Sequence, residues 1–116
     1  MTILIVDDNA RMRSMIRGIL AREDVECVEC GDGGTAVINF TEVRPAWVVM
    51  DIMLPVMNGI KATQEIMLRD PEARVVIVTN FDDPEYREAA VHAGARAFIL
   101  KEDLSRLKEV CLHRAT

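Results

Sequence analysis

Residues 47–59 read Trp-Val-Val-Met-Asp-Ile-Met-Leu-Pro-Val-Met-Asn-Gly, and this stretch decides the fold. An apolar run bounded by turn-forming residues is typical of a strand that is buried on both faces of a parallel sheet. Asp51 then stands at the carboxyl end of the strand, where open parallel sheets bind their ligands. Because an unpaired buried carboxylate is costly, we expect other charged groups close to Asp51.

The composition indicates one aliphatic domain. The chain has 116 residues, of which 50% are apolar and 4% aromatic, and this length suffices for a single hydrophobic core. The formal net charge of −5 argues against nucleic-acid binding, because that affinity comes mainly from neutralising phosphates. The apolar start breaks at Asp7 without the features of a signal peptide, and no apolar run reaches the roughly 20 residues of a membrane span. We therefore expect a cytoplasmic protein without membrane contact.

Strand-like and helix-like patterns alternate along the whole chain. The predicted strands are residues 3–6, 25–29, 47–50, 74–78 and 97–100. Each is followed by a predicted helix, and these helices begin at Asp8 or Asn9, after Gly34, at Asn58, at Asp83 and near Asp103. Strict alternation predicts a parallel sheet with helices on both faces. The best fit at this length is a flavodoxin-like, doubly wound α/β fold with five helices and strand order 2-1-3-4-5.

The first predicted helix is clearly amphipathic. Met12, Met15, Ile16, Ile19 and Leu20 recur at helical spacing and are expected to face the core. The charged residues of this helix take the other positions. We expect its arginines and both histidines of the chain at the surface, namely Arg11, Arg13, Arg17, His92 and His113.

Cys27 and Cys30 form a C-x-x-C pair inside a predicted strand. Residues three apart on a strand face opposite sides, so these two thiols are not expected to share a metal or a disulfide. Together with Cys111 they make an odd set in a chain without a secretion signal, which indicates free thiols in a reducing compartment.

Polar residues follow four of the five predicted strands. Asp7 and Asp8 follow the first, Asp51 the third, Thr79 ends the fourth segment and Lys101 follows the fifth. Three carboxylates meeting at one edge repel one another and attract a divalent cation, and all-oxygen ligands of this kind suit Mg²⁺. The lysine suits an anion and the threonine offers a hydroxyl donor. The set predicts a phosphoryl-transfer site in which a carboxylate forms an acyl phosphate.

These segments resemble the receiver domain of bacterial two-component response regulators, over essentially the whole chain. The matching motifs are Ile-Leu-Ile-Val-Asp-Asp at residues 3–8, Asp-Ile-Met-Leu-Pro-Val-Met-Asn-Gly at 51–59, Val-Ile-Val-Thr at 76–79 and Ala-Phe-Ile-Leu-Lys at 97–101. The segment that follows Thr79 resembles receivers joined to helix-turn-helix DNA-binding domains. The resemblance thus implies one receiver domain over residues 1–116, and a C-terminal effector domain was either removed from this chain or never part of it. Glu102 departs from the pattern, since a proline in a cis peptide often follows the lysine.

The resemblance implies a signalling domain that is activated by phosphorylation. Asp51 would accept a phosphoryl group from the phosphohistidine of a sensor histidine kinase, with Mg²⁺ neutralising charge. The metal ligands would be the side chains of Asp8 and Asp51 and the carbonyl of Met53, with Asp7 acting through water. Such a domain phosphorylates and dephosphorylates itself, so it is a switch rather than a conventional enzyme.

The resemblance also implies which residues read and limit the signal. Thr79 and Lys101 would contact the phosphoryl oxygens, and Phe98 is similar to the aromatic switch residue of the family. Met53 and Phe81 would flank the path of the attacking water. Because neither can orient a water, we expect a long-lived phosphorylated form that suits transcriptional output. Besides the kinase, a second copy of the chain is an expected partner after phosphorylation.

Two other classes of protein remain open. Gly31, Gly33 and Ala36 fit the G-x-G-x-x-A pattern of a dinucleotide-binding unit, with an aspartate about 20 residues further on. Against this, Asp32 would place a negative charge beside the pyrophosphate, and the acidic pair at Asp7 would have no role. The other class is a pseudo-receiver, a binding module that keeps the fold without phosphorylation, and the complete set of acids argues against it.

Overall fold

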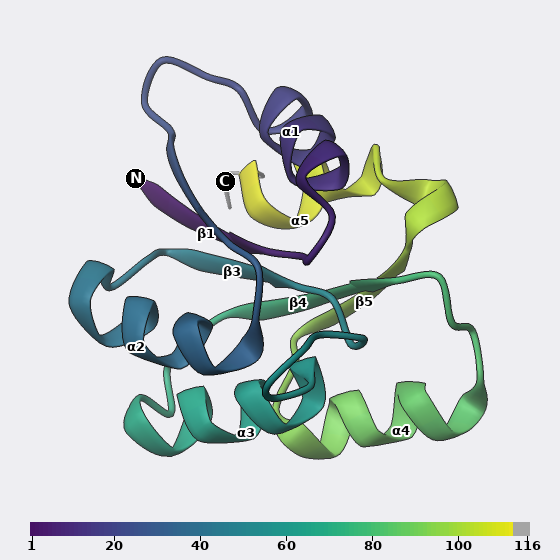
Figure 1. The fold of residues 1–116 in the computed structure, drawn as a ribbon. Helices are drawn as coiled ribbons and strands as arrows, with labels where there is room; N and C mark the ends of the chain where they lie inside the picture. The colour runs from purple at the N-terminus through teal and green to yellow at the C-terminus, as the bar shows by residue number, and fades with distance from the viewer. Residues whose placement is uncertain (113–116) are drawn as a thin grey trace.

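The computed structural model describes residues 1–112, and strands and helices alternate in it as predicted (Figure 1). His113, expected at the surface, lies outside the described residues. In chain order the elements are β1 (Thr2–Val6), α1 (Ala10–Ile19), β2 (Glu26–Cys30), α2 (Gly33–Val43), β3 (Trp47–Met50), α3 (Gly59–Arg69), β4 (Val75–Thr79), α4 (Pro84–Ala93), β5 (Ala97–Leu100), a 3-10 helix η1 (Lys101–Asp103) and α5 (Arg106–Leu112).

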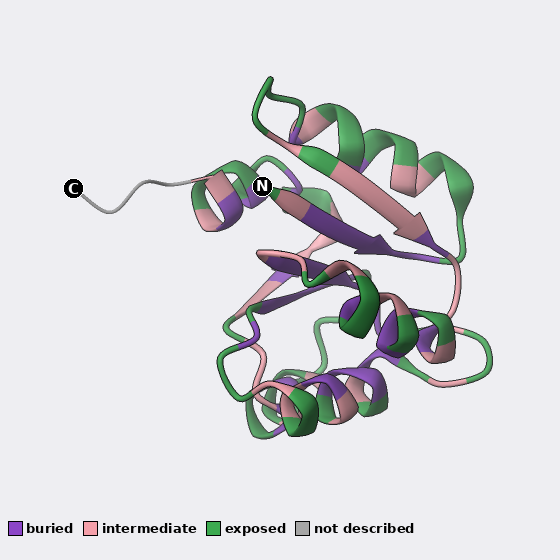
Figure 2. Cartoon of the chain, turned by 90° about the vertical axis from the view of Figure 1, so that its left-hand side faces the viewer, coloured by how far each residue is buried: buried purple, intermediate pink, exposed green. Residues whose placement is uncertain are grey.

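The five strands form one parallel sheet in the order β2-β1-β3-β4-β5. Helices α1 and α5 cover one face, and α2, α3 and α4 cover the other (Figure 1). The central strands β3 and β4 are buried along their whole length, whereas the more polar β2 lies at an edge (Figure 2). The predicted flavodoxin-like, doubly wound fold is therefore confirmed.

Successive residues of each strand pack into two separate cores. On β3, Val48 and Met50 belong to the core under α2, α3 and α4, while Val49 belongs to the core under α1 and α5. The same alternation separates Cys27 from Cys30 on β2, because Cys27 packs against the second core and Cys30 lies in the first. The predicted separation of these free thiols is thus confirmed.

Side-chain caps set where three of the helices begin. Asn9, Asp32 and Asn58 each accept a hydrogen bond from the backbone N–H three residues further on, which satisfies a donor that the helix leaves unpaired. Helix α4 begins differently, because Pro84 occupies its first turn and Asp83 makes no side-chain hydrogen bond to the helix. Asn9 follows the acidic pair after β1, and Asn58 ends the loop after β3. These two caps therefore fix the backbone of both segments at the carboxyl edge of the sheet.

Helix α1 is rotated about its axis relative to the prediction. Met15 was expected in the core but is 53% exposed, whereas Ile16 and Leu20 are fully buried. The buried stripe is centred on these two residues, which turns Met15 toward solvent and brings Arg13 next to the sheet. The prediction for Met15 is therefore wrong, and so is the prediction that Arg13 is a surface group, because its side chain is only 21% exposed.

Smaller differences concern boundaries near the edges of the sheet. Strand β2 is Glu26–Cys30 rather than 25–29, and α5 begins at Arg106 because η1 intervenes where the helix was expected to start. The peptide after Lys101 is trans, since residues 1–112 contain no cis peptide bond. None of the helices within this range has the length and apolar character that crossing a bilayer requires.

The loop between β3 and α3 packs so tightly at Gly59 that a side chain there has no room. A Cβ atom on Gly59 would lie 1.8 Å from the carbonyl oxygen of Asp51, whereas one on Gly18 of α1 would meet nothing within 4 Å. We expect Gly59→Ala to lower the free energy of unfolding by about 3 kcal/mol, the upper end for overpacking. Gly18→Ala should instead raise it by up to about 1 kcal/mol, because alanine favours helix. Urea denaturation measures both, and equal effects at the two sites would contradict the prediction.

Candidate functional site

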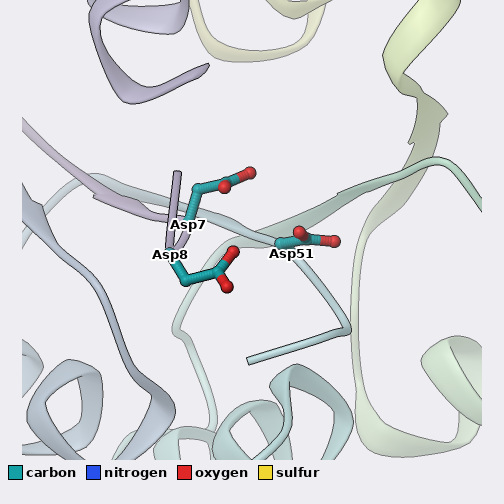
Figure 3. Close-up of side chains that lie close together, drawn as sticks. All are labelled: Asp7, Asp8 and Asp51. Atoms are coloured by element: carbon teal, nitrogen blue, oxygen red, sulfur yellow. The ribbon is translucent and has the colours of Figure 1, made fainter. Parts of the chain in front are cut away.

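The acidic residues that follow β1 and β3 meet at the carboxyl edge of the sheet (Figure 3). Asp7, Asp8 and Asp51 each offer a carboxylate oxygen, and these oxygens all lie within 4.8 Å of one another. Asp7 and Asp51 are buried, at 1% and 6% relative exposure, while Asp8 is exposed. The cluster thus has a buried floor and one side open to solvent. Such a set of oxygens is compatible with a small divalent cation that keeps some of its waters.

Lys101 joins two of these carboxylates. Its Nζ atom lies 2.9 Å from Oδ2 of Asp7 and 3.0 Å from Oδ2 of Asp51. Burial by itself would lower the pKa of Lys101, but the bonds to Asp7 and Asp51 outweigh it and the pKa is raised. The lysine therefore remains a cation and compensates part of the negative charge in the buried floor.

Asp51 experiences opposing influences on its charge. Burial raises the pKa of its carboxyl group, Lys101 lowers it, Asp7 raises it again, and the result is a raised pKa. Its Oδ1 atom accepts a hydrogen bond of 2.8 Å from the backbone N–H of Ile52, and its Oδ2 atom accepts from Lys101. A further cation near Asp51 would oppose the cost of burial, so the site favours binding of positive charge.

Thr79 and Phe98 lie on the neighbouring strands β4 and β5. Thr79 is fully buried, and its hydroxyl oxygen accepts a hydrogen bond of 3.4 Å from the backbone N–H of Phe81. Phe98 is half-buried, and the guanidinium carbon of Arg87 lies 4.6 Å from the centre of its ring. Arg87 also pairs with Asp82 in the β4–α4 loop at 2.6 Å. The aromatic ring and this loop are therefore connected through one arginine of α4.

Met53 and Phe81 are exposed residues of the loops that follow β3 and β4. Their relative exposures are 49% and 39%. The ring of Phe81 packs against that of Tyr86, with 5.7 Å between the ring centres. Phe81 thus packs against α4 at the surface rather than in the core. It lies two residues beyond Thr79, and Met53 lies two residues beyond Asp51.

The glycine-rich segment 31–36 serves to pack a helix end. Asp32 accepts hydrogen bonds from the backbone N–H of Thr35 at 2.7 Å and from its hydroxyl at 2.8 Å. A Cβ atom on Gly33 would lie 1.9 Å from the carbonyl oxygen of Met57, so the β3–α3 loop covers this helix N-terminus. A pyrophosphate needs the free N–H groups of such a terminus. Here the Asp32 carboxylate accepts from the N–H of Thr35 and the Pro55 carbonyl oxygen accepts from the N–H of Gly33 at 3.5 Å, which argues against the dinucleotide-binding alternative.

The sequence did not reveal one residue beside the acidic cluster. Arg13 of α1 donates from Nη1 to the carbonyl oxygen of Asp7 at 2.7 Å and from Nε to Oε1 of Glu29 at 3.0 Å. The signal that could have found it is Glu29, an acidic residue near the end of an otherwise mixed strand beside β1. Its charge needs a partner, and an arginine on the adjoining helix supplies it.

Comparison with known proteins defines the class of this protein. Residues 3–111 match the family model of the response regulator receiver domain, and the chain belongs to this family. The chemotaxis protein CheY of Thermotoga maritima is 40% identical to it over 100 residues, which cover 85% of this chain and 83% of that protein. The chain is therefore a signalling receiver that is activated by phosphorylation, as in two-component systems.

Solved structures of related proteins agree with this assignment. A DNA-binding response regulator of the LuxR family from Staphylococcus aureus superposes with a TM-score of 0.83 at 31% identity, covering 93% of this chain and 92% of that one. The CheX-CheY-BeF3-Mg+2 complex from Borrelia burgdorferi contains a chain with a TM-score of 0.84 at 28% identity, covering 94% and 87%. The cluster of Asp7, Asp8 and Asp51 fits the phosphoryl-accepting aspartate site of the family.

The raised pKa of Asp51 should appear as a pH-dependent cost of folding. A carboxyl group whose pKa is higher in the folded than in the unfolded chain binds its proton more tightly when folded, so its ionisation destabilises the fold. Relative to Asp51→Asn, the metal-free wild type should lose stability as the pH rises from about 4, the ordinary pKa of an aspartate, through the raised pKa. Above that value the difference should be constant.

Urea denaturation of both proteins across this range of pH, with a chelator present, measures the difference. Glu23→Gln, which removes an exposed carboxylate before β2, is the control. A difference between wild type and Asp51→Asn that does not change with pH would contradict the prediction.

Proposed function

We propose that Asp51 is the phosphoryl acceptor of this receiver and that Asp8 and Asp51 bind Mg²⁺, with Asp7 acting through water. The observation that carries the proposal is the position of Asp51 directly after β3, the strand between β1 and β4. Asp7 and Asp8 follow β1 on one side of it, Thr79 ends β4 on the other, and Lys101, directly after β5, contacts Asp51 at 3.0 Å. A phosphoryl group on Asp51 would therefore lie between the acids after β1 and Thr79, whereas one on Asp7 would not.

In the proposed reaction a carboxylate oxygen of Asp51 attacks the phosphorus of a phosphohistidine on a sensor kinase. The new P–O bond replaces the P–N bond, whose electron pair leaves with the imidazole, and the product is an acyl phosphate. Bound Mg²⁺ supplies charge neutralisation for the phosphoryl oxygens. Asp8 and Asp51 side chains and the Met53 carbonyl would hold it, and Asp7 would act through water. Lys101, which now contacts Asp51, would turn its ammonium group to a phosphoryl oxygen.

The same groups would transmit the change. A phosphoryl group adds a charge of roughly −1.5 to −2, which attracts the Lys101 ammonium and the Thr79 hydroxyl. Because Thr79 is bonded to the backbone of Phe81, its movement would draw the β4–α4 loop along. Arg87 lies over the ring of Phe98 and also pairs with Asp82 of that loop, so a movement of the loop would reach Phe98 through Arg87. The output surface is then formed by α4, β5 and α5.

The proposed output is the control of transcription. Residues 1–116 would act as one receiver domain upstream of a DNA-binding effector, with a second copy of the chain as partner after phosphorylation. The likeness to a DNA-binding response regulator of the LuxR family supports this proposal. The net charge of −5 also favours protein partners over direct nucleic-acid binding by the receiver.

Phosphorylation by a small acyl phosphate in the presence of Mg²⁺ tests the acceptor. We expect wild type to gain one base-labile phosphoryl group and Asp51→Asn to gain none, because the amide cannot form the acyl phosphate. Intact mass spectrometry measures the gain. Asp70→Asn, which removes a carboxylate after α3, should label like wild type. Equal labelling of wild type and Asp51→Asn would overturn the assignment.

A second test concerns the lifetime of the phosphorylated form. Met53 and Phe81 are exposed apolar residues that cannot position a water, so Phe81→Glu or Met53→Asn should speed hydrolysis. We expect about a tenfold effect for each, which corresponds to about 1.4 kcal/mol in the barrier. Loss of the label over time measures the rate. Phe81→Leu keeps the apolar cover and should decay like wild type, whereas unchanged decay in both polar variants would show that these side chains do not control water access.

A further inference from the structure

We propose that Arg13 is a positioning residue of the metal site, which holds the peptide between Asp7 and Asp8 so that Asp8 presents its carboxylate toward Asp51. The inference rests on the proposed function, in which Asp8 and Asp51 bind Mg²⁺. It starts from the hydrogen bond of 2.7 Å that Nη1 of Arg13 donates to the carbonyl oxygen of Asp7. That carbonyl group belongs to the peptide that joins the two acids.

Other contacts already fix Asp7 but not the direction of Asp8. The backbone N–H of Asp7 donates to the carbonyl oxygen of Cys30 at 3.2 Å, and its side chain accepts from the backbone N–H of Asn9 at 2.9 Å and binds Lys101. Asp8 is exposed, so little packing holds its carboxylate, and the backbone at residue 8 sets the region that the carboxylate can reach. The bond from Arg13 fixes the plane of the peptide that leads into Asp8, and it thereby sets the direction in which the Asp8 side chain leaves the chain.

Arg13 is itself held in place from the edge strand β2. Its Nε atom donates to Oε1 of Glu29 at 3.0 Å, and Arg17 donates to Oε2 of the same carboxylate at 2.7 Å. A Cβ atom on Gly31 would lie 3.6 Å from Nη1 of Arg13, an ordinary van der Waals contact, so the guanidinium lies beside the backbone at this residue. Glu29 and Arg13 thus form one arm from β2 to the β1–α1 turn.

The positioning role and a simple charge effect predict opposite results. If the guanidinium acted only through its charge, it would repel a cation bound at the acids, and its removal would strengthen Mg²⁺ binding. If it orients a ligand, its removal weakens binding, and loss of partners that orient metal ligands typically costs 10–100-fold in affinity. Arg17 supplies a matched control, because it shares Glu29 with Arg13 but donates its other bond to the Cys27 carbonyl, away from the acids.

The experiment is a calorimetric titration of the full chain with Mg²⁺. We expect Arg13→Gln to raise the Kd about tenfold and Arg17→Gln to leave it unchanged. The Kd of Arg13→Lys should lie between those of Arg13→Gln and wild type, because lysine keeps the charge but lacks the forked guanidinium that joins Glu29 to the Asp7 carbonyl. Glu29→Gln, which loosens the arm without touching the acids, should weaken binding in the same direction and replaces Arg13→Gln if that variant does not fold.

A second readout separates ligand orientation from general damage to the fold. With a small acyl phosphate, labelling of Arg13→Gln should be slow at low Mg²⁺ and reach the wild-type rate at saturating Mg²⁺. Equal Kd values for Arg13→Gln and Arg17→Gln, or tighter binding by Arg13→Gln, would overturn the positioning role. If wild type binds no Mg²⁺, or if Asp8→Ala binds it normally, the proposed metal site itself is wrong and the positioning role falls with it.

Discussion

Three carboxylates within 4.8 Å of one another, two of them buried, are the constraint on which the rest of this structure depends. Their mutual repulsion and their loss of hydration both oppose folding, and an isolated buried charge is costly. Lys101 reduces this cost by contacting Asp7 and Asp51 together. That contact exists because β5, which the lysine directly follows, runs parallel to β1 and β3, so their carboxyl ends lie at the same edge of the sheet. The parallel arrangement of the strands thus brings the carboxylates together and also supplies the cation that offsets their repulsion.

Three basic side chains make different kinds of contact in this structure. Lys101 contacts the carboxylates themselves, Arg13 contacts the backbone between two of them, and Arg87 lies over Phe98 and pairs with Asp82 in the loop after β4. Under the proposed function, Lys101 would transfer its contact to a phosphoryl group and Arg87 would connect the aromatic ring to the moving loop. Arg13 would orient a metal ligand under the proposed positioning role.

The loop after Asp51 concentrates features that stability alone would not favour. Val56 is a β-branched residue with a φ of 68° and 88% relative exposure, and residues in this region of backbone space cost about 1–3 kcal/mol. Gly59 closes the same loop against the Asp51 carbonyl, where even a Cβ atom does not fit. Local rules of this kind are most often broken at functional sites, because the surrounding structure holds them in place for binding or chemistry.

The sequence by itself determined the order of strands and helices, the doubly wound sheet and the residues at the strand ends. It could do so because burial on both faces of a strand leaves a continuous apolar run, and because parallel strands bring their carboxyl ends to one edge. Only the tertiary structure decided how α1 is rotated, and with it that Met15 faces solvent while Arg13 reaches the Asp7 carbonyl. It also decided that Gly33 packs against the β3–α3 loop rather than opening a phosphate site. The helical spacing of apolar residues shows that α1 has an apolar stripe, but it does not show which side of the stripe packs against the sheet. The rotation of the helix depends on contacts between residues distant in the chain, such as that of Arg13 with Glu29.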